Sequence, residues 1–134
     1  MSGLPSDIQK EINDTIADTA CNKGMQVVLA INYGGRDEII RAFKKYLSCN
    51  KTTAGFNEEN FKEYLDNPDI PDPDLIIRSA GEHRTSNFLL WESAYSELYF
   101  SQKLWPEWDK EDLITAIESF KKRVRRFGAV NEVA

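Results

Sequence analysis

The sequence is poor in the residues that mark several classes of protein. It has 2 cysteines among 134 residues, too few for a disulfide framework or a four-cysteine zinc site. Its longest aliphatic run, Val27 to Ile31, is far shorter than the ~20 apolar residues of a transmembrane helix. Residues 1–5 also lack the basic and apolar regions of a secretory signal. We therefore expect a cytoplasmic protein, in a reducing compartment, without a membrane span.

A surplus of positive charge is also absent, since the formal net charge is -5. General binding to nucleic acid depends on surplus lysine and arginine, so we expect no nucleic-acid partner. With only 7 glycines and 5 prolines, and with 41% hydrophobic residues, the chain is neither disordered nor fibrous. Its length suits one domain or part of one. Because the net charge is negative, any anionic ligand must be held by a local cluster of positive charge.

Apolar residues recur with helical and strand spacing in alternation along the chain. The helical pattern predicts helices at residues 5–20, 36–47, 57–65 and 86–95, and a last helix from Asp109 that is followed by Gly128. Short runs rich in aliphatic and aromatic residues predict strands at 25–32, 74–78 and 98–100. This alternation predicts an α/β fold, with a layered, mainly parallel sheet and flanking helices.

Two arginines and a serine follow the predicted strand at residues 74–78. Arg78 stands at the end of the strand, Arg84 at the far end of the following loop, and Ser86 at the start of a predicted helix. Guanidinium groups match phosphate oxygens in pairs, and a helix N-terminus favours negative charge. The spacing lets both arginines converge on one anion, such as a diphosphate. In the alternative interpretation, the arginines pair with nearby acidic residues.

Glu97 directly precedes the predicted strand at residues 98–100. A carboxylate in such apolar surroundings is costly to desolvate unless it is paired or bound to a metal. Mg²⁺ takes one or two protein carboxylates together with substrate phosphates. Glu97 is therefore either a magnesium ligand beside the diphosphate site or the partner of an arginine.

Motifs spread in order over nearly the whole chain resemble those of a known enzyme family. They are SGLP at 2–5, LAINYGGR at 29–36, PDPDLIIR at 71–78, GEHR at 81–84, SNFLLW at 86–91, AYSELYF at 94–100, LWP at 104–106 and RRFG at 125–128. The family is that of the cis-prenyltransferases, or undecaprenyl diphosphate synthases. Ser79 and Ala80 depart from the residues usual in the family, as does Thr85, but no ligand group is lost.

The resemblance implies a reaction and a set of binding residues. The family condenses isopentenyl diphosphate with an allylic diphosphate and forms double bonds in the cis configuration. Residues that match Arg78, Arg84 and Ser86 grip the diphosphate of isopentenyl diphosphate, and the one that matches Glu97 helps to hold the cofactor Mg²⁺. We therefore expect these four residues to bind substrate and metal.

The resemblance also implies partners for the chain. Members of the family are dimers, and the terminal Arg-x-Gly, here Arg126 and Gly128, reaches the active site of the partner subunit. We therefore expect substrate contacts from these two residues in a homodimer or heterodimer. Peripheral contact with a membrane, through the lipid product, is implied as well.

The family's N-terminal Asp-Gly-Asn-Gly-Arg-Trp-Ala motif has no counterpart among the 134 residues. In the family, its aspartate positions Mg²⁺ and its backbone cradles the allylic diphosphate. Residues 1–134 thus resemble the C-terminal half of one cis-prenyltransferase domain, without a catalytic residue, and allylic diphosphate is expected to bind only when the missing half is supplied. Two interpretations follow: a truncated or split transferase that is inactive alone, or a non-catalytic subunit that binds diphosphate or dimerises and completes the site of another chain.

Overall fold

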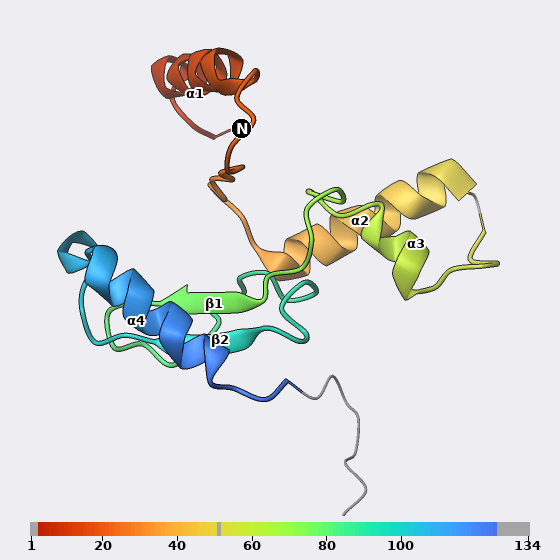
Figure 1. Ribbon diagram of the computed structural model, residues 1–134. Coiled ribbons are helices and arrows are strands. Elements are labelled where there is room, and N and C mark those ends of the chain that lie inside the picture. The colour runs from red at the N-terminus through yellow and green to blue at the C-terminus, as the bar shows by residue number, and fades with distance from the viewer. Residues whose placement is uncertain (1–2, 51, 126–134) are drawn as a thin grey trace, which may run out of the picture. The chain divides into compact units, whose positions relative to one another are not determined.

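The computed structural model describes residues 3–50 and 52–125. In chain order, its elements are α1 (Ser6–Thr19), α2 (Gly35–Asn50), α3 (Glu58–Lys62), β1 (Leu75–Arg78), β2 (Glu97–Phe100), the 3-10 helix η1 (Trp105–Glu107) and α4 (Lys110–Lys121) (Figure 1). The chain divides into two compact units, one ending at Tyr33 and the other beginning at Gly34. None of the helices described is both long enough and apolar enough to cross a membrane.

The first unit contains the helix predicted at residues 5–20, which is confirmed as α1. Pro5 precedes the helix, and the Gln9 side chain donates a hydrogen bond of 2.8 Å to the Leu4 carbonyl. Isoleucines spaced four residues apart form an apolar stripe, yet Ile8 and Ile16 remain exposed. The stripe therefore lies on the helix as predicted, and nothing within this unit buries it.

The strand predicted at residues 25–32 is wrong. This segment is irregular, and the Ile31 N–H donates to the nearby Leu29 carbonyl instead of to a neighbouring strand. A strand needs a neighbour to satisfy its backbone N–H and C=O groups, and residues 3–33 include no strand that provides one. The apolar composition that favours a buried strand is present, but the pairing partner is not.

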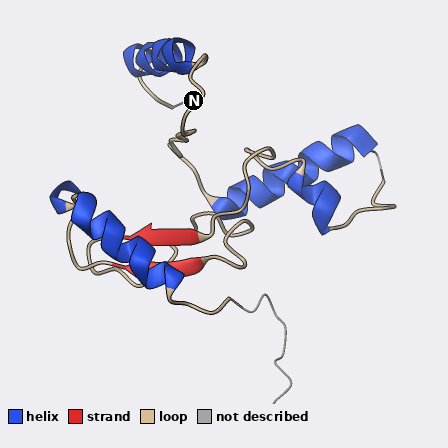
Figure 2. Ribbon diagram, viewed as in Figure 1, coloured by secondary structure: helices blue, strands red, loops and turns tan. Residues whose placement is uncertain are grey.

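The second unit is built around two parallel strands (Figure 2). β1 pairs with β2 so that Leu75 lies opposite Glu97 and Arg78 lies opposite Phe100. Both strands were predicted from the sequence, at 74–78 and 98–100, and are confirmed. The small parallel sheet with flanking helices confirms the predicted α/β class.

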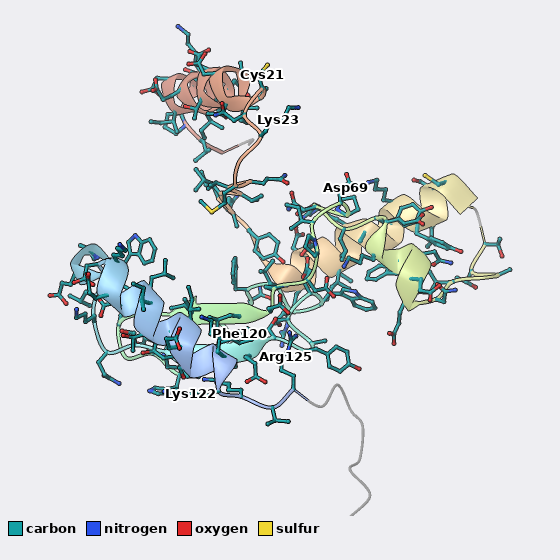
Figure 3. The ribbon with its side chains drawn as sticks, viewed as in Figure 1. Cys21, Lys23, Asp69, Phe120, Lys122 and Arg125 are labelled. Atoms are coloured by element: carbon teal, nitrogen blue, oxygen red, sulfur yellow. The ribbon has the colours of Figure 1, made fainter. Side chains whose placement is uncertain are left out.

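Helix α4 begins with a capping box and packs along β2. The Asp109 side chain accepts a hydrogen bond of 3.0 Å from the Asp112 N–H, which satisfies one of the unpaired donors of the first turn. Beyond the last turn, the Arg125 guanidinium lies 5.7 Å from the centre of the Phe120 ring, and both side chains can be followed in Figure 3. The predicted final helix is thus confirmed up to Lys121, while Gly128 lies outside the described residues.

The buried core of the second unit lies between α2 and α3. Ala42, Phe61 and Leu65 are buried, and the Trp91 ring packs on Phe61 with 4.5 Å between ring centres. The helix predicted at 57–65 is confirmed at its start, where Asn57 caps α3, but the helix ends at Lys62. The core therefore joins two helices to the segment that leads into β2.

The helix predicted at residues 86–95 is wrong, because this segment is a series of turns. Ser86, Asn87 and Leu89 have φ angles of 50°, 64° and 45°. A right-handed helix needs negative φ at every residue, so three left-handed residues within four positions exclude it. The serine and asparagine that favour helix capping in the sequence favour turns equally well.

Two carboxyl groups meet beside this core. Glu38, on α2, is 1% exposed and accepts a hydrogen bond of 3.0 Å from the Asp66 N–H. The Glu92 side chain lies beside Glu38, and its Oε2 atom is buried with no hydrogen-bond partner among the described residues. Burial raises the pKa of Glu92, and the negative charges of Glu38 and Asp72 raise it further. The neutral, protonated form of Glu92 is therefore favoured in this part of the fold.

We expect Glu92→Gln to stabilise the protein at pH 8 by about 1 kcal/mol, because a neutral amide replaces a buried carboxylate that lacks a partner. The pKa of Glu92 in the folded state lies above its ordinary value of 4.5. Wild-type stability therefore falls as the pH rises from that value through the raised pKa, and is unaffected by Glu92 below it. Thermal unfolding from pH 4 to pH 8 measures this difference.

The exposed Glu59 supplies the control, since Glu59→Gln also removes one negative charge from the same unit. We expect its unfolding curve to keep the wild-type dependence on pH. Equal pH dependence in Glu92→Gln and the wild type would contradict the raised pKa of Glu92.

Candidate functional site

The loop after β1 is held against the chain that leaves β2. The Ala80 N–H donates to the Lys103 carbonyl at 2.8 Å, and the Gly81 N–H donates to the Ser101 carbonyl at 2.8 Å. Both Ala80 and Gly81 have a φ of 67°, and a Cβ at Gly81 would lie 2.7 Å from the Gln102 Oε1 atom. Glycine at position 81 avoids the strain of this φ and leaves the Gln102 side chain in place, and the start of the loop is fixed by backbone bonds.

Arg78 organises the far side of the same loop. Its Nη1 atom donates hydrogen bonds of 2.7 Å to the Arg84 carbonyl and 3.0 Å to the Ser86 Oγ. Ser86 accepts in this contact, so its own hydroxyl hydrogen can still be donated to a ligand. The structure thus brings together the three residues that the sequence predicts to surround a diphosphate.

These three residues line a pocket at the carboxyl end of β1. The pocket has a volume of about 170 Å³ and is lined by Ile76, Ile77, Arg78, Arg84, Thr85, Ser86, Phe88, Leu98 and Phe100. Pockets for drug-sized ligands measure roughly 300–1,000 Å³, so this one suits a small anion or the polar end of a larger molecule. Its cationic rim and apolar wall fit a phosphate attached to a short hydrocarbon.

The two arginines differ in how they are paired. The Arg84 guanidinium forms an ion pair with Glu82 and is 62% exposed, whereas Arg78 donates hydrogen bonds to two neutral oxygens. The alternative in which arginines pair with acidic neighbours therefore holds for Arg84. An exposed ion pair contributes only about 0–1 kcal/mol, so a phosphate with two or three charged hydrogen bonds can displace the Glu82 carboxylate.

No helix begins at Ser86, so the expected helix dipole does not act on this pocket. The sequence suggests helix capping for Asn87, but in the structure this residue joins the loop to the start of α2. Its backbone carbonyl accepts from the Gly35 N–H at 2.7 Å, and its Oδ1 accepts from the Arg36 N–H at 2.9 Å. The only local signal for this contact is that asparagine tolerates turns with positive φ.

Glu97 lies at the opposite end of the sheet from the arginine pocket. It is paired with Leu75, whereas Arg78 is paired with Phe100, and a rise of ~3.3 Å per residue puts the two ends about 10 Å apart. The Glu97 Oε2 atom accepts a hydrogen bond of 2.8 Å from Arg123 Nη1, and both side chains are mostly buried. The structure therefore realises the alternative in which Glu97 is the partner of an arginine.

The residues around Glu97 do not by themselves fit a magnesium ion. Within residues 3–50 and 52–125, no cluster of three or more histidine, cysteine, aspartate or glutamate side chains is suited to hold a metal. The one carboxylate predicted to bind Mg²⁺ already has its charge balanced by Arg123. The other two predicted substrate residues, Arg126 and Gly128, lie outside the described residues, so their contribution stays a prediction.

Comparison with protein families gives a match over almost all of this sequence. Residues 1–128 match the family model described as putative undecaprenyl diphosphate synthase. The isoprenyl transferase of Treponema denticola is 55% identical over 128 residues, which are 96% of this chain and 56% of the relative. The isoprenyl transferase of Thermotoga maritima is 50% identical over 131 residues and is likewise 56% covered.

Solved structures agree with the sequence comparison. Lavandulyl diphosphate synthase from Lavandula x intermedia, solved in complex with dimethylallyl diphosphate, matches 96% of this chain with a TM-score of 0.91 and 36% identity, over 57% of its own chain. A probable undecaprenyl diphosphate synthase from Campylobacter jejuni matches 96% with a TM-score of 0.82 and 40% identity, over 59% of its chain.

The chain spans about half the length of the curated relatives that it matches. Within this chain, the match covers residues 1–128 and includes both strands and the arginine loop between them. The family resemblance that the sequence motifs predict is thus confirmed, and the chain belongs to the prenyltransferase family described as putative undecaprenyl diphosphate synthase.

Proposed function

We propose that this chain is the part of a cis-prenyltransferase that binds isopentenyl diphosphate. The observation that supports this most directly is the contact of Arg78 with the Arg84 carbonyl and the Ser86 hydroxyl at the rim of the pocket. Arg78 and Arg84 hold the diphosphate, Ser86 adds a hydroxyl donor, and the wall formed by Ile76 and Phe100 faces the hydrocarbon.

In this proposal, the chain orients one of two substrates. Two charged forks and a hydroxyl fix the diphosphate, so the double bond of isopentenyl diphosphate is presented in one direction. The allylic substrate, whose diphosphate group leaves in the family reaction, is bound by the family's Asp-Gly-Asn-Gly-Arg-Trp-Ala segment. That segment has no counterpart in residues 1–134. The complex of lavandulyl diphosphate synthase with dimethylallyl diphosphate supports an allylic ligand for the whole enzyme.

We further propose that the family's Mg²⁺ takes its donors from the diphosphates and from another polypeptide segment. Bound Mg²⁺ neutralises diphosphate charge and assists its departure. Glu97 is held by Arg123 in this chain, so it becomes a donor only when that ion pair opens. Homodimer or heterodimer formation, with Arg126 and Gly128 reaching the partner, belongs to the same proposal.

A second candidate is a non-catalytic subunit that completes the site of another chain. The exposed apolar side chains of α4 favour it, since Leu113, Ile114 and Ile117 are 46%, 47% and 37% exposed. Apolar residues at helical spacing on one exposed face mark an interaction surface. This candidate shares the diphosphate pocket but does not require turnover with a supplied N-terminal segment.

We expect Arg84→Ala and Arg78→Ala to weaken the binding of isopentenyl diphosphate by about 1.5–3 kcal/mol each, because each removes a charged hydrogen-bonding partner. Arg78→Ala also releases the loop, so Arg84→Ala is the cleaner measure of ligand contact. Isothermal titration calorimetry measures both affinities. Arg41→Ala is the matched control, because Arg41 pairs with Asp37 on α2 and with Asp66 in the turn after α3. None of these three residues lines the pocket.

The affinity of Arg41→Ala should equal that of the wild type. Equal affinity in the wild type, Arg78→Ala and Arg84→Ala would show that the two arginines serve the fold alone, and the proposed function would then be wrong.

The purified chain alone is expected not to elongate prenyl diphosphates, because proximity of two bound substrates supplies much of the rate and one site is missing. Incorporation of labelled isopentenyl diphosphate, with farnesyl diphosphate and Mg²⁺, measures elongation. Coexpression with the segment of the Treponema denticola relative that lies outside the match, which we expect to be its N-terminal part, should restore turnover. Ordinary turnover by the chain alone contradicts the proposal, and binding without restored turnover favours the non-catalytic subunit.

Glu97→Gln and Arg123→Gln are each expected to lower the free energy of unfolding by about 1 kcal/mol, and the double variant by no more than either. The reason is that both changes remove the same ion pair between β2 and the end of α4. We also expect Mg²⁺ at about 10 mM to leave the midpoint of thermal unfolding of the wild type unchanged. Stabilisation of the wild type by Mg²⁺, absent in Glu97→Gln, would instead identify Glu97 as a ligand in the chain alone.

A further inference from the structure

We propose that Asn87 is the positioning residue of the arginine pocket, which it fixes to the N-terminus of α2. The inference rests on the proposed function and deepens it, because Asn87 acts through its neighbours in the loop and not through the diphosphate. It is carried by hydrogen bonds, close backbone packing and strained backbone angles.

Asn87 satisfies two backbone donors at the start of α2. The Gly35 N–H reaches the Asn87 carbonyl at 2.7 Å, and the Arg36 N–H reaches the Asn87 Oδ1 at 2.9 Å. The first N–H groups of a helix have no partner within the helix, so an external acceptor there is strongly favoured. The helix end is rigid, and Asn87 thereby attaches the loop to a fixed point 51 residues away in sequence.

The glycines before α2 allow this approach. A Cβ at Gly34 would lie 2.8 Å from the Asn87 Nδ2 atom, and a Cβ at Gly35 would lie 2.9 Å from the Leu90 Cγ atom. Both distances are too short for any side chain, so the loop and the helix start fit only when glycine occupies both positions. The two glycines thus let Asn87 and Leu90 lie close to the start of α2.

The backbone angles show why such an anchor is needed. Ser86 and Leu89 have φ angles of 50° and 45°, in a region that residues other than glycine, asparagine and aspartate rarely occupy. Strained residues of this kind persist only when their surroundings hold them. Arg78 restrains Ser86 from the side of β1, and Asn87, at a φ of 64°, restrains it from the side of α2.

The contacts that the Asn87 side chain already makes distinguish it from a residue that binds the anion. Its acceptor oxygen is bonded to the Arg36 N–H, and its amide nitrogen lies against Gly34. Asn87 is also absent from the residues that line the pocket, although Ser86 and Phe88 on either side of it are present. Its effect on an anion must therefore pass through the position of Ser86 and of the Arg84 carbonyl.

The test replaces the side chain and keeps the backbone angle. Asn87→Gly retains the positive φ and removes the bond to the Arg36 N–H, and we expect it to weaken pyrophosphate binding about fivefold, the equivalent of one net hydrogen bond. The matched control is Asn57→Gly, since the Asn57 Oδ1 caps α3 through the Asn60 N–H at 2.9 Å. Both variants lose an asparagine cap, but only the first touches the pocket loop.

A second readout needs no ligand. The Phe88 N–H donates to the Thr85 carbonyl at 3.1 Å inside the loop, so its hydrogen exchange reports loop order. We expect faster exchange at Phe88 in Asn87→Gly, wild-type exchange in Asn57→Gly, and recovered protection in Asn87→Asp, which keeps both the acceptor and the tolerance of positive φ.

The outcomes separate this inference from the proposed function. Wild-type protein that binds no pyrophosphate overturns the proposed function, and Phe88 exchange then decides whether Asn87 orders the loop. Pyrophosphate binding that is equal in the wild type and Asn87→Gly overturns the positioning inference while the proposed function stands. Equal losses in Asn87→Gly and Asn57→Gly overturn it as well, because general destabilisation then explains both.

Discussion

The contact between the Arg78 side chain and the Arg84 main chain is the constraint on which the second unit's polar surface depends. A charged donor at the end of β1 is bonded to a carbonyl six residues later, so strand and loop form one body. Hydrogen bonds from charged groups contribute about 1.5–3 kcal/mol, which is enough to offset the roughly 1–3 kcal/mol cost of one strained residue such as Ser86. The same guanidinium faces the pocket, and one group therefore serves fold and ligand site together.

Local sequence patterns predicted those parts of the fold that local interactions decide. The α4 capping box, α1 and the two strands carry their signals within a few neighbouring residues, and all are confirmed. The segment at 25–32 has the composition of a strand, but a strand also needs a partner distant in sequence. The turns at 86–95 escaped prediction because serine and asparagine suit a helix cap and a left-handed turn alike.

In the candidate site, the sequence predicted which residues lie together but not which partners their charged groups have. Arg78, Arg84 and Ser86 lie together because a strand end and a short following loop restrict where they can go. The partners of the charged groups were not predictable, since Arg84 with Glu82 and Arg123 with Glu97 were each one of several pairings that the spacing allowed. The contact of Asn87 with α2 was not predictable, because it joins two segments far apart in sequence and no local pattern in either segment indicates it.

The exposed segment at residues 25–31 has a consequence for how such a chain exists in a cell. It carries no charge, is rich in β-branched and aliphatic residues, and leaves Met25, Val27 and Leu29 at 87%, 68% and 73% exposure. Uncharged stretches of this composition pair readily with copies of themselves and are bound by holding chaperones. The segment therefore offers apolar side chains, and backbone groups outside any sheet, to a strand that lies beside it.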